Sequence, residues 1–318
     1  MPGFFFRGKK GQMAKLDKYT GVIPAFYACY DGEGKINRSA VRQLVDYYID
    51  RGVNGLYVNG SSGECIYLTV EERKRIIETV VDQADGRLTI INHVACNNTA
   101  DSMELARHAE SLGVDAIASI PPIYFHLPEE AIADYWNDIS SAAPHTDFII
   151  YNIPQLAGVA LSRDLYLKML ENPRVIGVKN SSMAPYDIQI FKTCGKGDHV
   201  VFNGPDEQFI AGRVIGADAG IGGTYGAMPE LFIAMNDCLR TGNLSLAGEI
   251  QNVVNGIIEE LCAGRGNMYA MIKEVLRIKE GIDLGSVRRP LAPLTGEDRE
   301  LAKKTAARIE EAVARYGL

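Results

Sequence analysis

Short runs of apolar and β-branched residues recur along the chain, separated by longer stretches of mixed polarity. Eight such runs can be distinguished, at residues 21–28, 54–60, 88–95, 115–122, 147–152, 174–180, 199–204 and 217–224. Their apolar character is continuous rather than alternating, which is typical of parallel strands covered on both faces. The pattern therefore predicts eight buried parallel strands.

The stretches between these runs have the periodicity of amphipathic helices. Each places apolar residues on one face and charges on the other, as in the sets Ala40, Leu44, Val45, Tyr48 and Ile76, Ile77, Val80, Val81. Thr69 with Glu72, and Ser162 before Arg-Asp, are typical of helix N-termini. The chain thus alternates strand and helix.

Eight strand–helix units without a Pro/Gly/Ser-rich linker favour an α/β fold of the (β/α)8 TIM barrel class. An open doubly wound sheet is the alternative, but no G-x-G-x-x-G follows the first strand. We expect a disordered or artificial extension over residues 1–18, the barrel over 19–228 and additional C-terminal helices over 229–318. The stretch 288–294, RRPLAPL, should connect two of those helices.

Composition and charge restrict the possible partners. The chain has 318 residues, 47% of them hydrophobic, and a net charge of −7, which gives no basic surface for nucleic acid. It contains no run of 18 apolar residues to cross a membrane. Its six cysteines are scattered and its five histidines form no metal-binding motif. We expect a cytoplasmic protein with reduced thiols, no metal and no nucleic-acid or membrane partner.

The sixth apolar run carries Lys179 next to its end, at the rim where a barrel carries its reactive groups. A lone lysine there more often extends its ammonium to solvent. However, the neighbouring run carries Tyr151 at the equivalent point, and neither run contains a carboxylate near its end to pair with the amine. Burial of such an amine lowers its pKa and makes it a nucleophile for carbonyl carbons, with a phenol nearby to transfer protons.

The turn Gly60-Ser61-Ser62-Gly63-Glu64 follows the second run. Paired hydroxyls and accessible backbone N–H groups are suited to a carboxylate. An ordinary Gly/Ser turn before a helix is an equally good interpretation of this stretch alone.

Taken together in order, several motifs closely resemble the superfamily of pyruvate-dependent aldolases that contains N-acetylneuraminate lyase and dihydrodipicolinate synthase. The resemblance runs from about Tyr19 to the C-terminus. It rests on GSSGE (60–64), PP-I-Y (121–124), YNIP (151–154), VKNSS (178–182), NGPDE (203–207) and GADAGIGGTYG (216–226).

The resemblance implies a role for each matching residue. Lys179 would form the Schiff base with substrate, Tyr151 would transfer protons, and Ser61 and Ser62 would hold the pyruvate carboxylate. Tyr124 matches a tyrosine that reaches a neighbouring subunit's site, which implies an oligomer, usually a homotetramer built from tight dimers; a core aromatic is the other interpretation. The remaining substrate-binding positions would be Ser181, Gly204, Asp206, Glu207, Gly223 and Tyr269.

Departures from the family patterns bear on the substrate. Leu156 occupies the position of the synthase arginine that binds an aldehyde substrate's carboxylate, which argues against the synthase. Asp206 and Glu207 match the lyase pair that binds the sugar-acid tail, although a solvated helix N-terminus would explain them as well. Three further positions differ from the lyase pattern. Ser181 stands where lyases usually have Thr, Gly223 where many have Ser, and Tyr269 where they have Phe.

We therefore expect a class I aldolase that reversibly cleaves N-acetylneuraminate to pyruvate and N-acetylmannosamine. It would need no cofactor beyond the covalent Schiff base on Lys179. The alternatives are an aldolase for a 2-keto-3-deoxy sugar acid or 4-hydroxy-2-oxoglutarate, dihydrodipicolinate synthase, and a non-catalytic barrel that senses a keto acid. His93, Cys65 and Cys96 are expected to be structural.

Overall fold

The computed structural model describes residues 16–195 and 197–318. Most of the expected extension, residues 1–18, lies outside the described residues. Its last three residues form a turn beside the barrel, in which Lys18 makes an ion pair with Asp115.

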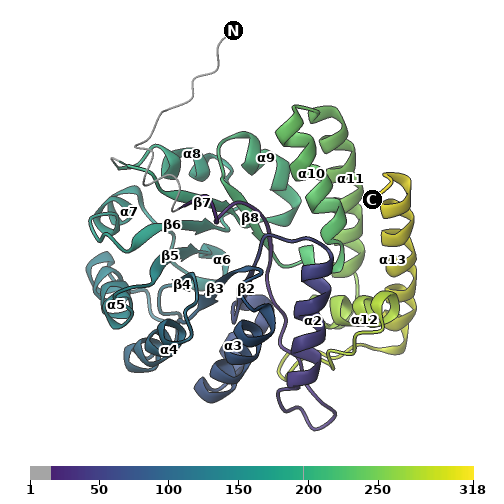
Figure 1. The fold of residues 1–318 in the computed structure, drawn as a ribbon, viewed down its shortest axis with the longest axis horizontal. Coiled ribbons are helices and arrows are strands. Elements are labelled where there is room, and N and C mark those ends of the chain that lie inside the picture. The colour runs from purple at the N-terminus through teal and green to yellow at the C-terminus, as the bar shows by residue number, and fades with distance from the viewer. Residues whose placement is uncertain (1–15, 196) are drawn as a thin grey trace.

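Eight strands form one parallel sheet that curves into a nearly closed barrel (Figure 1). Their order is β1-β8-β7-β6-β5-β4-β3-β2, and a parallel bridge between Ala25 and Tyr57 connects the two ends. This confirms the predicted (β/α)8 class, and every apolar run contains one strand. The strands are β1 (Gly21–Pro24), β2 (Gly55–Val58), β3 (Thr89–His93), β4 (Ala116–Ser119), β5 (Asp147–Asn152), β6 (Val175–Asn180), β7 (Val200–Asn203) and β8 (Ala219–Gly222).

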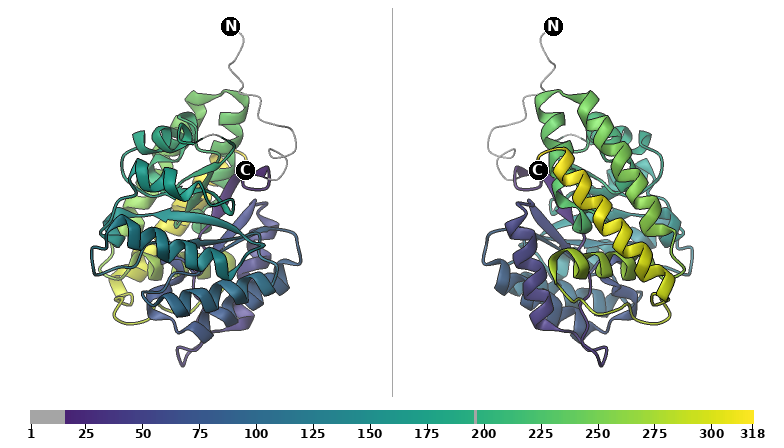
Figure 2. Two further views of the ribbon diagram at one scale, coloured as in Figure 1. Left: turned by 90° about the vertical axis from the view of Figure 1, so that its left-hand side faces the viewer. Right: turned by 90° about the vertical axis from the view of Figure 1, so that its right-hand side faces the viewer.

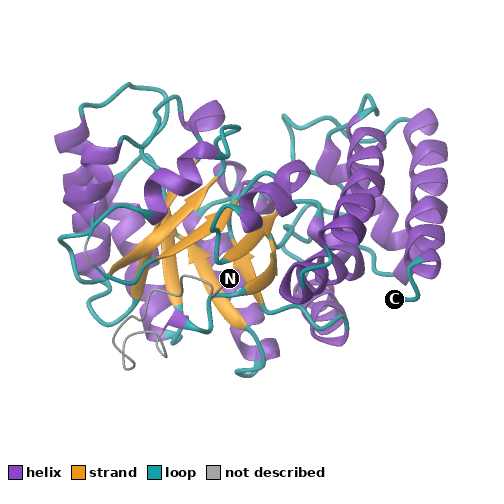
Figure 3. Cartoon of the chain, turned by 90° about the horizontal axis from the view of Figure 1, so that it is seen from above, coloured by secondary structure: helices purple, strands orange, loops and turns teal. Residues whose placement is uncertain are grey.

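Helices surround the strands, as Figure 3 shows. The longer ones are α2 (Arg38–Asp50), α3 (Val70–Ala84), α4 (Thr99–Ser111), α5 (Glu129–Ala142), α7 (Arg163–Met169), α8 (Tyr186–Lys192), α9 (Phe209–Val214), α10 (Pro229–Thr241), α11 (Leu244–Cys262), α12 (Met268–Glu280) and α13 (Gly296–Arg315). Short helical turns are η1 (Ser61–Gly63), η2 (Cys65–Tyr67), α6 (Pro154–Ala157), η3 (Asp206–Gln208) and η4 (Tyr225–Ala227).

Local sequence signals fix where two of these helices begin. Thr69 and Glu72 form a reciprocal capping box at the start of α3, and the Ser162 side chain accepts from Leu165 N at the start of α7. A cap of this kind contributes about 1 kcal/mol to stability. Both predicted helix starts are confirmed.

Two apolar clusters fill the fold. The larger lies between the strands and the surrounding helices, and the smaller fills the inside of the barrel. Inside the barrel, Tyr57 and Tyr151 are buried next to aliphatic side chains such as Ile91 and Ile149. Because the interior is packed in this way, a substrate can bind only at the rim of the barrel.

The C-terminal helices gather on one side of the molecule, where α13 lies beside α11 and α12 (Figure 2, right). Helix α10 contacts both α9 and β1, so it takes the place of the eighth barrel helix. The stretch 288–294 lies in the connection between α12 and α13, as predicted. In the part of the chain that the structure describes, no helix is long and apolar enough to cross a membrane.

Candidate active site

Lys179 and Tyr151 lie side by side at the rim, on the adjacent strands β6 and β5. They are register partners in the parallel ladder, so their side chains leave the sheet on the same face. Two residues before the lysine, Gly177 lets β6 approach β7 closely, because a Cβ there would lie 1.9 Å from Val200 O. The glycine in the VIGVK sequence is therefore required by strand packing.

The amine of Lys179 is enclosed by aromatic rings. Its Nζ lies 4.1 Å from the ring centroid of Tyr57 and 4.0 Å from that of Tyr151, and the residue is 5% exposed. Among residues 16–195 and 197–318, no carboxylate is within ion-pair distance of this nitrogen. Burial lowers the pKa of Lys179 to about 7, and the charge of Asp206 opposes that shift. A large share of the amine is thus neutral near pH 7 and able to attack a carbonyl carbon.

The Tyr151 phenol stays protonated in this environment. Burial raises its pKa to about 12, and the nearby hydroxyls of Ser61 and Ser181 oppose the rise. A protonated phenol can give its proton to a departing group and, as the phenolate, take one back from another group. The arrangement therefore supplies a proton-transfer group directly beside the nucleophile.

The turn predicted to hold a carboxylate is η1, which follows β2. It begins after Gly60, where a Cβ would lie 2.5 Å from the Tyr57 ring, and ends at Glu64 with a left-handed φ of 56°. Ser61 and Ser62 both line the pocket above the lysine. The Gly/Ser turn thus belongs to the site and is more than a connection to the next helix.

The opposite side of the site is built by the segments after β7 and β8. Gly204 must be a glycine because a Cβ would lie 2.7 Å from the backbone oxygen of Asn180. Asp206 Oδ2 accepts hydrogen bonds from both Thr224 N and Thr224 Oγ1, each at 2.6 Å. Burial raises the pKa of Asp206 to about 7. Asp206 is only 7% exposed, so the interpretation as a solvated helix end is wrong for Asp206, whereas Glu207 is exposed.

These elements enclose a pocket of about 200 Å³. It brings together the predicted residues Lys179, Tyr151, Ser61, Ser62, Ser181, Gly204, Asp206, Glu207, Gly223 and Tyr269. The outer wall adds side chains that the sequence analysis had not assigned to the site: Ile153, Gln155, Met183, Ile258 and Met268. Ile153, Gln155 and Met183 could have been predicted from the sequence, because each follows shortly after a strand that ends at the rim.

Gly223 and Tyr269, which both differ from the lyase pattern, lie next to each other in the structure. A Cβ on Gly223 would lie 3.0 Å from Ser62 Oγ and 3.8 Å from Tyr269 Cε1. Burial raises the pKa of Tyr269 to about 12, and the neighbouring Ser62 opposes that rise. The phenol at 269 therefore brings a hydroxyl to the place next to Gly223, where a serine side chain would have supplied one.

Tyr124 is the one predicted site residue that lies away from this pocket. It follows β4 with a φ of 85°, is 86% exposed and packs edge-on against the exposed Phe125. Because Tyr124 is so exposed, its interpretation as a core aromatic is wrong.

Tyr57 is a buried neighbour of the site that the sequence analysis did not identify. Its ring is as close to Lys179 Nζ as that of Tyr151 and meets the Tyr151 ring edge-on at a centroid distance of 5.7 Å. The Tyr57 hydroxyl has no hydrogen-bond partner within the described ranges, and the residue does not line the pocket. The ring therefore serves to keep the amine away from water.

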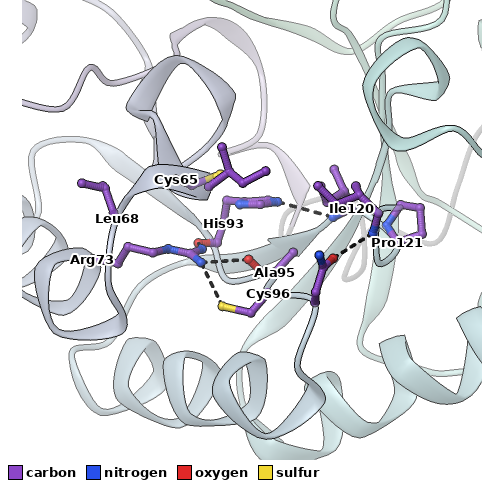
Figure 4. Close-up of a pocket in the computed structure, with 11 residues that line it drawn as sticks. Cys65, Leu68, Arg73, His93, Ala95, Cys96, Ile120 and Pro121 are labelled. Atoms are coloured by element: carbon purple, nitrogen blue, oxygen red, sulfur yellow. Dashed lines mark hydrogen bonds between the residues drawn. The ribbon is translucent and has the colours of Figure 1, made fainter. Parts of the chain in front are cut away.

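A second pocket, of about 210 Å³, is lined by residues of η2, β3 and the segments after β3 and β4, among them Cys65, His93 and Ile120 (Figure 4). Its His93 ring contacts Asn59 O at 3.0 Å through Nδ1 and accepts from Ile120 N through Nε2, while burial depresses its pKa. Burial likewise raises the thiol pKa of Cys65 and Cys96. The His93 contacts agree with the structural role expected for it, whereas Cys65 and Cys96 are only partly buried.

Comparison with known proteins gives a consistent picture. The model of the dihydrodipicolinate synthetase family matches residues 18–309. An N-acetylneuraminate lyase of Mediterraneibacter gnavus is 59% identical over 312 residues, covering 98% of this chain and 99% of that protein.

Two solved structures are similar over nearly the whole chain. A Ruminococcus gnavus sialic acid aldolase, a catalytic lysine mutant, superimposes with a TM-score of 0.94 at 60% identity, covering 94% of this chain and 98% of that one. The Clostridium difficile protein CdNal, in complex with mannosamine, has a TM-score of 0.87 at 32% identity, with coverages of 91% and 99%.

Proposed function

The chain belongs to the dihydrodipicolinate synthetase family, and on this premise we propose that it is an N-acetylneuraminate lyase. It is a carbon–carbon lyase that reversibly cleaves N-acetylneuraminate to pyruvate and N-acetylmannosamine. The observation that carries the chemistry is the Lys179 amine, buried between two phenol rings with a pKa of about 7.

The first half of the reaction forms the Schiff base. The neutral amine of Lys179 attacks the C2 ketone of the open-chain sugar acid, and loss of water leaves an iminium ion. Tyr151 supplies the proton that the departing hydroxyl requires and stays as a phenolate, next to the hydroxyls of Ser61 and Ser181, until the second half of the reaction. The hydroxyls of Ser61 and Ser62 hold the substrate carboxylate.

The second half breaks the C3–C4 bond. Tyr151 receives the proton of the C4 hydroxyl, the C3–C4 electron pair moves into the iminium, and N-acetylmannosamine leaves as the aldehyde. Protonation of the resulting enamine at C3 and addition of water release pyruvate and restore the amine. The iminium nitrogen is the electron sink, so the proposed mechanism requires no metal or organic cofactor.

The pocket supports a lyase rather than the synthase. The position where the synthase has an arginine for its aldehyde substrate is held by Leu156, a 63% exposed residue at the mouth of the pocket. An apolar side chain cannot bind a second carboxylate there. Asp206 and Glu207, on the other side, offer acceptors for the hydroxyl groups of a sugar tail.

A panel of substrates tests this assignment. Pyruvate release is measured from N-acetylneuraminate, a 2-keto-3-deoxy sugar acid and 4-hydroxy-2-oxoglutarate, together with synthase activity on pyruvate and aspartate semialdehyde. We expect the kcat/KM for N-acetylneuraminate to exceed the others by roughly 100-fold, because its hydroxylated tail matches the acceptors that Asp206 and Glu207 offer. Faster cleavage of another member would reassign the enzyme, and binding without any turnover would indicate a sensor.

The pKa values near 7 predict how the chemistry depends on pH. Trapping of pyruvate on the enzyme by cyanoborohydride should fall roughly tenfold per unit as the pH drops below about 7, because protonation removes the neutral Lys179 amine. Lys179 and Asp206 interact and titrate as a pair. The Asp206 charge raises the pKa of Lys179, so Asp206→Asn should move the pH at which trapping begins to fall, the acidic limb of the profile, to lower pH. A shift to higher pH would contradict the assignment of the limb to Lys179.

We also propose that the enzyme works in the cytoplasm as a homotetramer built from tight dimers. Six free thiols suit a reducing compartment. The aromatic pair Tyr124 and Phe125, 86% and 71% exposed, supports a contact between copies in which Tyr124 reaches the neighbouring subunit's site. There the phenol would extend the proton path that begins at Tyr151 and Ser61.

A further inference from the structure

We propose that helix α12 holds the serine turn, residues 60–64, in place through two contacts one helical turn apart, Lys273 with Glu64 and Tyr269 with Ser62. In this inference Glu64 and Lys273 are positioning residues: they touch no substrate but set where Ser61 and Ser62 meet the substrate carboxylate. The kinetic test of this inference rests on the proposed function, whereas the hydrogen-exchange test does not.

The serine turn ends in a conformation that needs support from outside. Glu64 has a φ of 56° and a ψ of 29°, a left-handed conformation that costs a non-glycine residue free energy. Its side chain is fully buried. Such a residue persists only where its surroundings determine its position strongly.

The Glu64 carboxylate receives that support from three donors. Oε1 accepts from Lys273 Nζ at 2.7 Å, and Oε2 accepts from Arg288 N at 2.7 Å and from Tyr30 OH at 3.2 Å. Lys273 lies 209 residues further along the chain, on α12. The turn is thus attached to the C-terminal part of the chain rather than to its neighbours in sequence.

Lys273 is committed to this contact. Its side chain is 1% exposed, and Nζ donates a second hydrogen bond to Ser286 O at 2.9 Å and lies 4.7 Å from the Tyr30 ring centroid. Burial lowers the pKa of Lys273, and Glu64 opposes that shift. An ammonium without its carboxylate would be unfavourable in this place, so the pair fixes the distance between α12 and the turn.

Tyr269 makes the second contact from the same face of α12. Residues 269 and 273 are four apart, so their side chains lie next to each other along the helix. The Tyr269 phenol lies beside Ser62, next to Gly223 in the pocket wall, and the Asn267 cap, which accepts from Tyr269 N, fixes the start of the helix. One rigid helix therefore holds both ends of the segment 62–64.

Three variants and one matched control separate positioning from stability. Lys273→Met removes the cation, Glu64→Gln/Lys273→Met removes both charges at similar shape, and Tyr269→Phe removes one hydroxyl. The control is Glu274→Gln on the same helix, which breaks the ion pairs with Arg277 and Arg299 without touching the turn.

The kinetic readout is cyanoborohydride trapping of pyruvate on Lys179. We expect Lys273→Met and the double variant to raise the half-saturating pyruvate concentration roughly ten- to hundredfold, and Tyr269→Phe less, because small displacements of positioning groups have effects of this size. The rate at saturating pyruvate should stay within about threefold, since Lys179 and Tyr151 are unchanged. Glu274→Gln should leave both quantities as in the parent.

The double variant decides between the two explanations. It removes the unpaired charge, so its melting temperature should recover relative to Lys273→Met, while its half-saturating pyruvate concentration should remain high. If both quantities recover, the pair only stabilises the fold and the inference is wrong.

Hydrogen exchange without substrate supplies the readout that does not depend on activity. Amides of residues 60–68 should exchange faster in Lys273→Met and in the double variant, but not in Glu274→Gln. Unchanged exchange in this segment would overturn the inference whatever the enzyme's activity. A parent enzyme that pyruvate does not modify would instead contradict the proposed function.

Discussion

Lys179→Met is expected to abolish cleavage of N-acetylneuraminate, lowering kcat/KM by roughly 10⁴-fold or more, as removal of a covalent nucleophile does. Methionine has a similar length and suits the two enclosing phenol rings, so the pocket should keep its shape. The measurement is pyruvate release. In addition, borohydride with pyruvate should inactivate the parent enzyme and add a reduced pyruvyl group to Lys179, as read by mass spectrometry of its peptides.

A control lysine makes this prediction specific. Lys192 on α8 is also partly buried but pairs with Asp218 at 2.9 Å, away from the pocket. Lys192→Met should keep the activity and the adduct on Lys179. An adduct elsewhere, or turnover retained in Lys179→Met, would disprove the Schiff-base mechanism.

Lys179→Met should also reveal how much stability the buried amine costs the folded chain. The pKa of Lys179 is lowered in the folded chain, so the unfolded chain binds its proton more tightly and parent stability rises with pH between about 7 and the ordinary lysine range. Lys179→Met lacks this dependence. Its advantage in melting temperature over the parent should therefore be largest at pH 7 or below and shrink toward pH 10.

Patterns close in sequence account for most of the fold. Continuous apolar runs separated by amphipathic stretches were enough to predict eight parallel strands and the barrel, because both faces of such strands must be buried. The helix starts at Thr69 and Ser162 followed from contacts within four residues. The ends of the strands were predicted less well. The run DFIIYN (147–152) is strand throughout, whereas the run GVIPAFYA (21–28) extends four residues beyond the end of β1.

The candidate site was predictable where a strand carries the residue to the rim. Lys179 and Tyr151 end adjacent strands, so the fold alone places them together. The Glu64–Lys273 contact had no such signal, because it joins positions 209 residues apart across the C-terminal helices. Burial of Asp206 depends on Thr224 in the next unit, and the sequence around Asp206 alone suits a solvated helix end equally well.

Tyr57 and Tyr151 show how two residues of one type can differ in role. Both rings lie about equally close to Lys179 Nζ, but only Tyr151 lines the pocket and has the hydroxyls of Ser61 and Ser181 near its own. The Tyr57 hydroxyl has no partner within the described part of the chain. The two rings thus contribute the same enclosure, and only one adds a hydroxyl for proton transfer.

Tyr151→Phe is therefore expected to lower kcat by roughly 10²- to 10⁴-fold, the usual contribution of a general acid–base group. The phenylalanine ring still covers the amine, so pyruvate should still be trapped on Lys179, more slowly but with a similar half-saturating concentration. The measurements are kcat for N-acetylneuraminate cleavage and the trapping kinetics with pyruvate. Tyr57→Phe is the matched control: it keeps a ring 4.1 Å from the same nitrogen and removes only an unpartnered hydroxyl. Its kcat should stay within about threefold of the parent, and equal losses in the two variants would show that ring packing, rather than the Tyr151 hydroxyl, limits turnover.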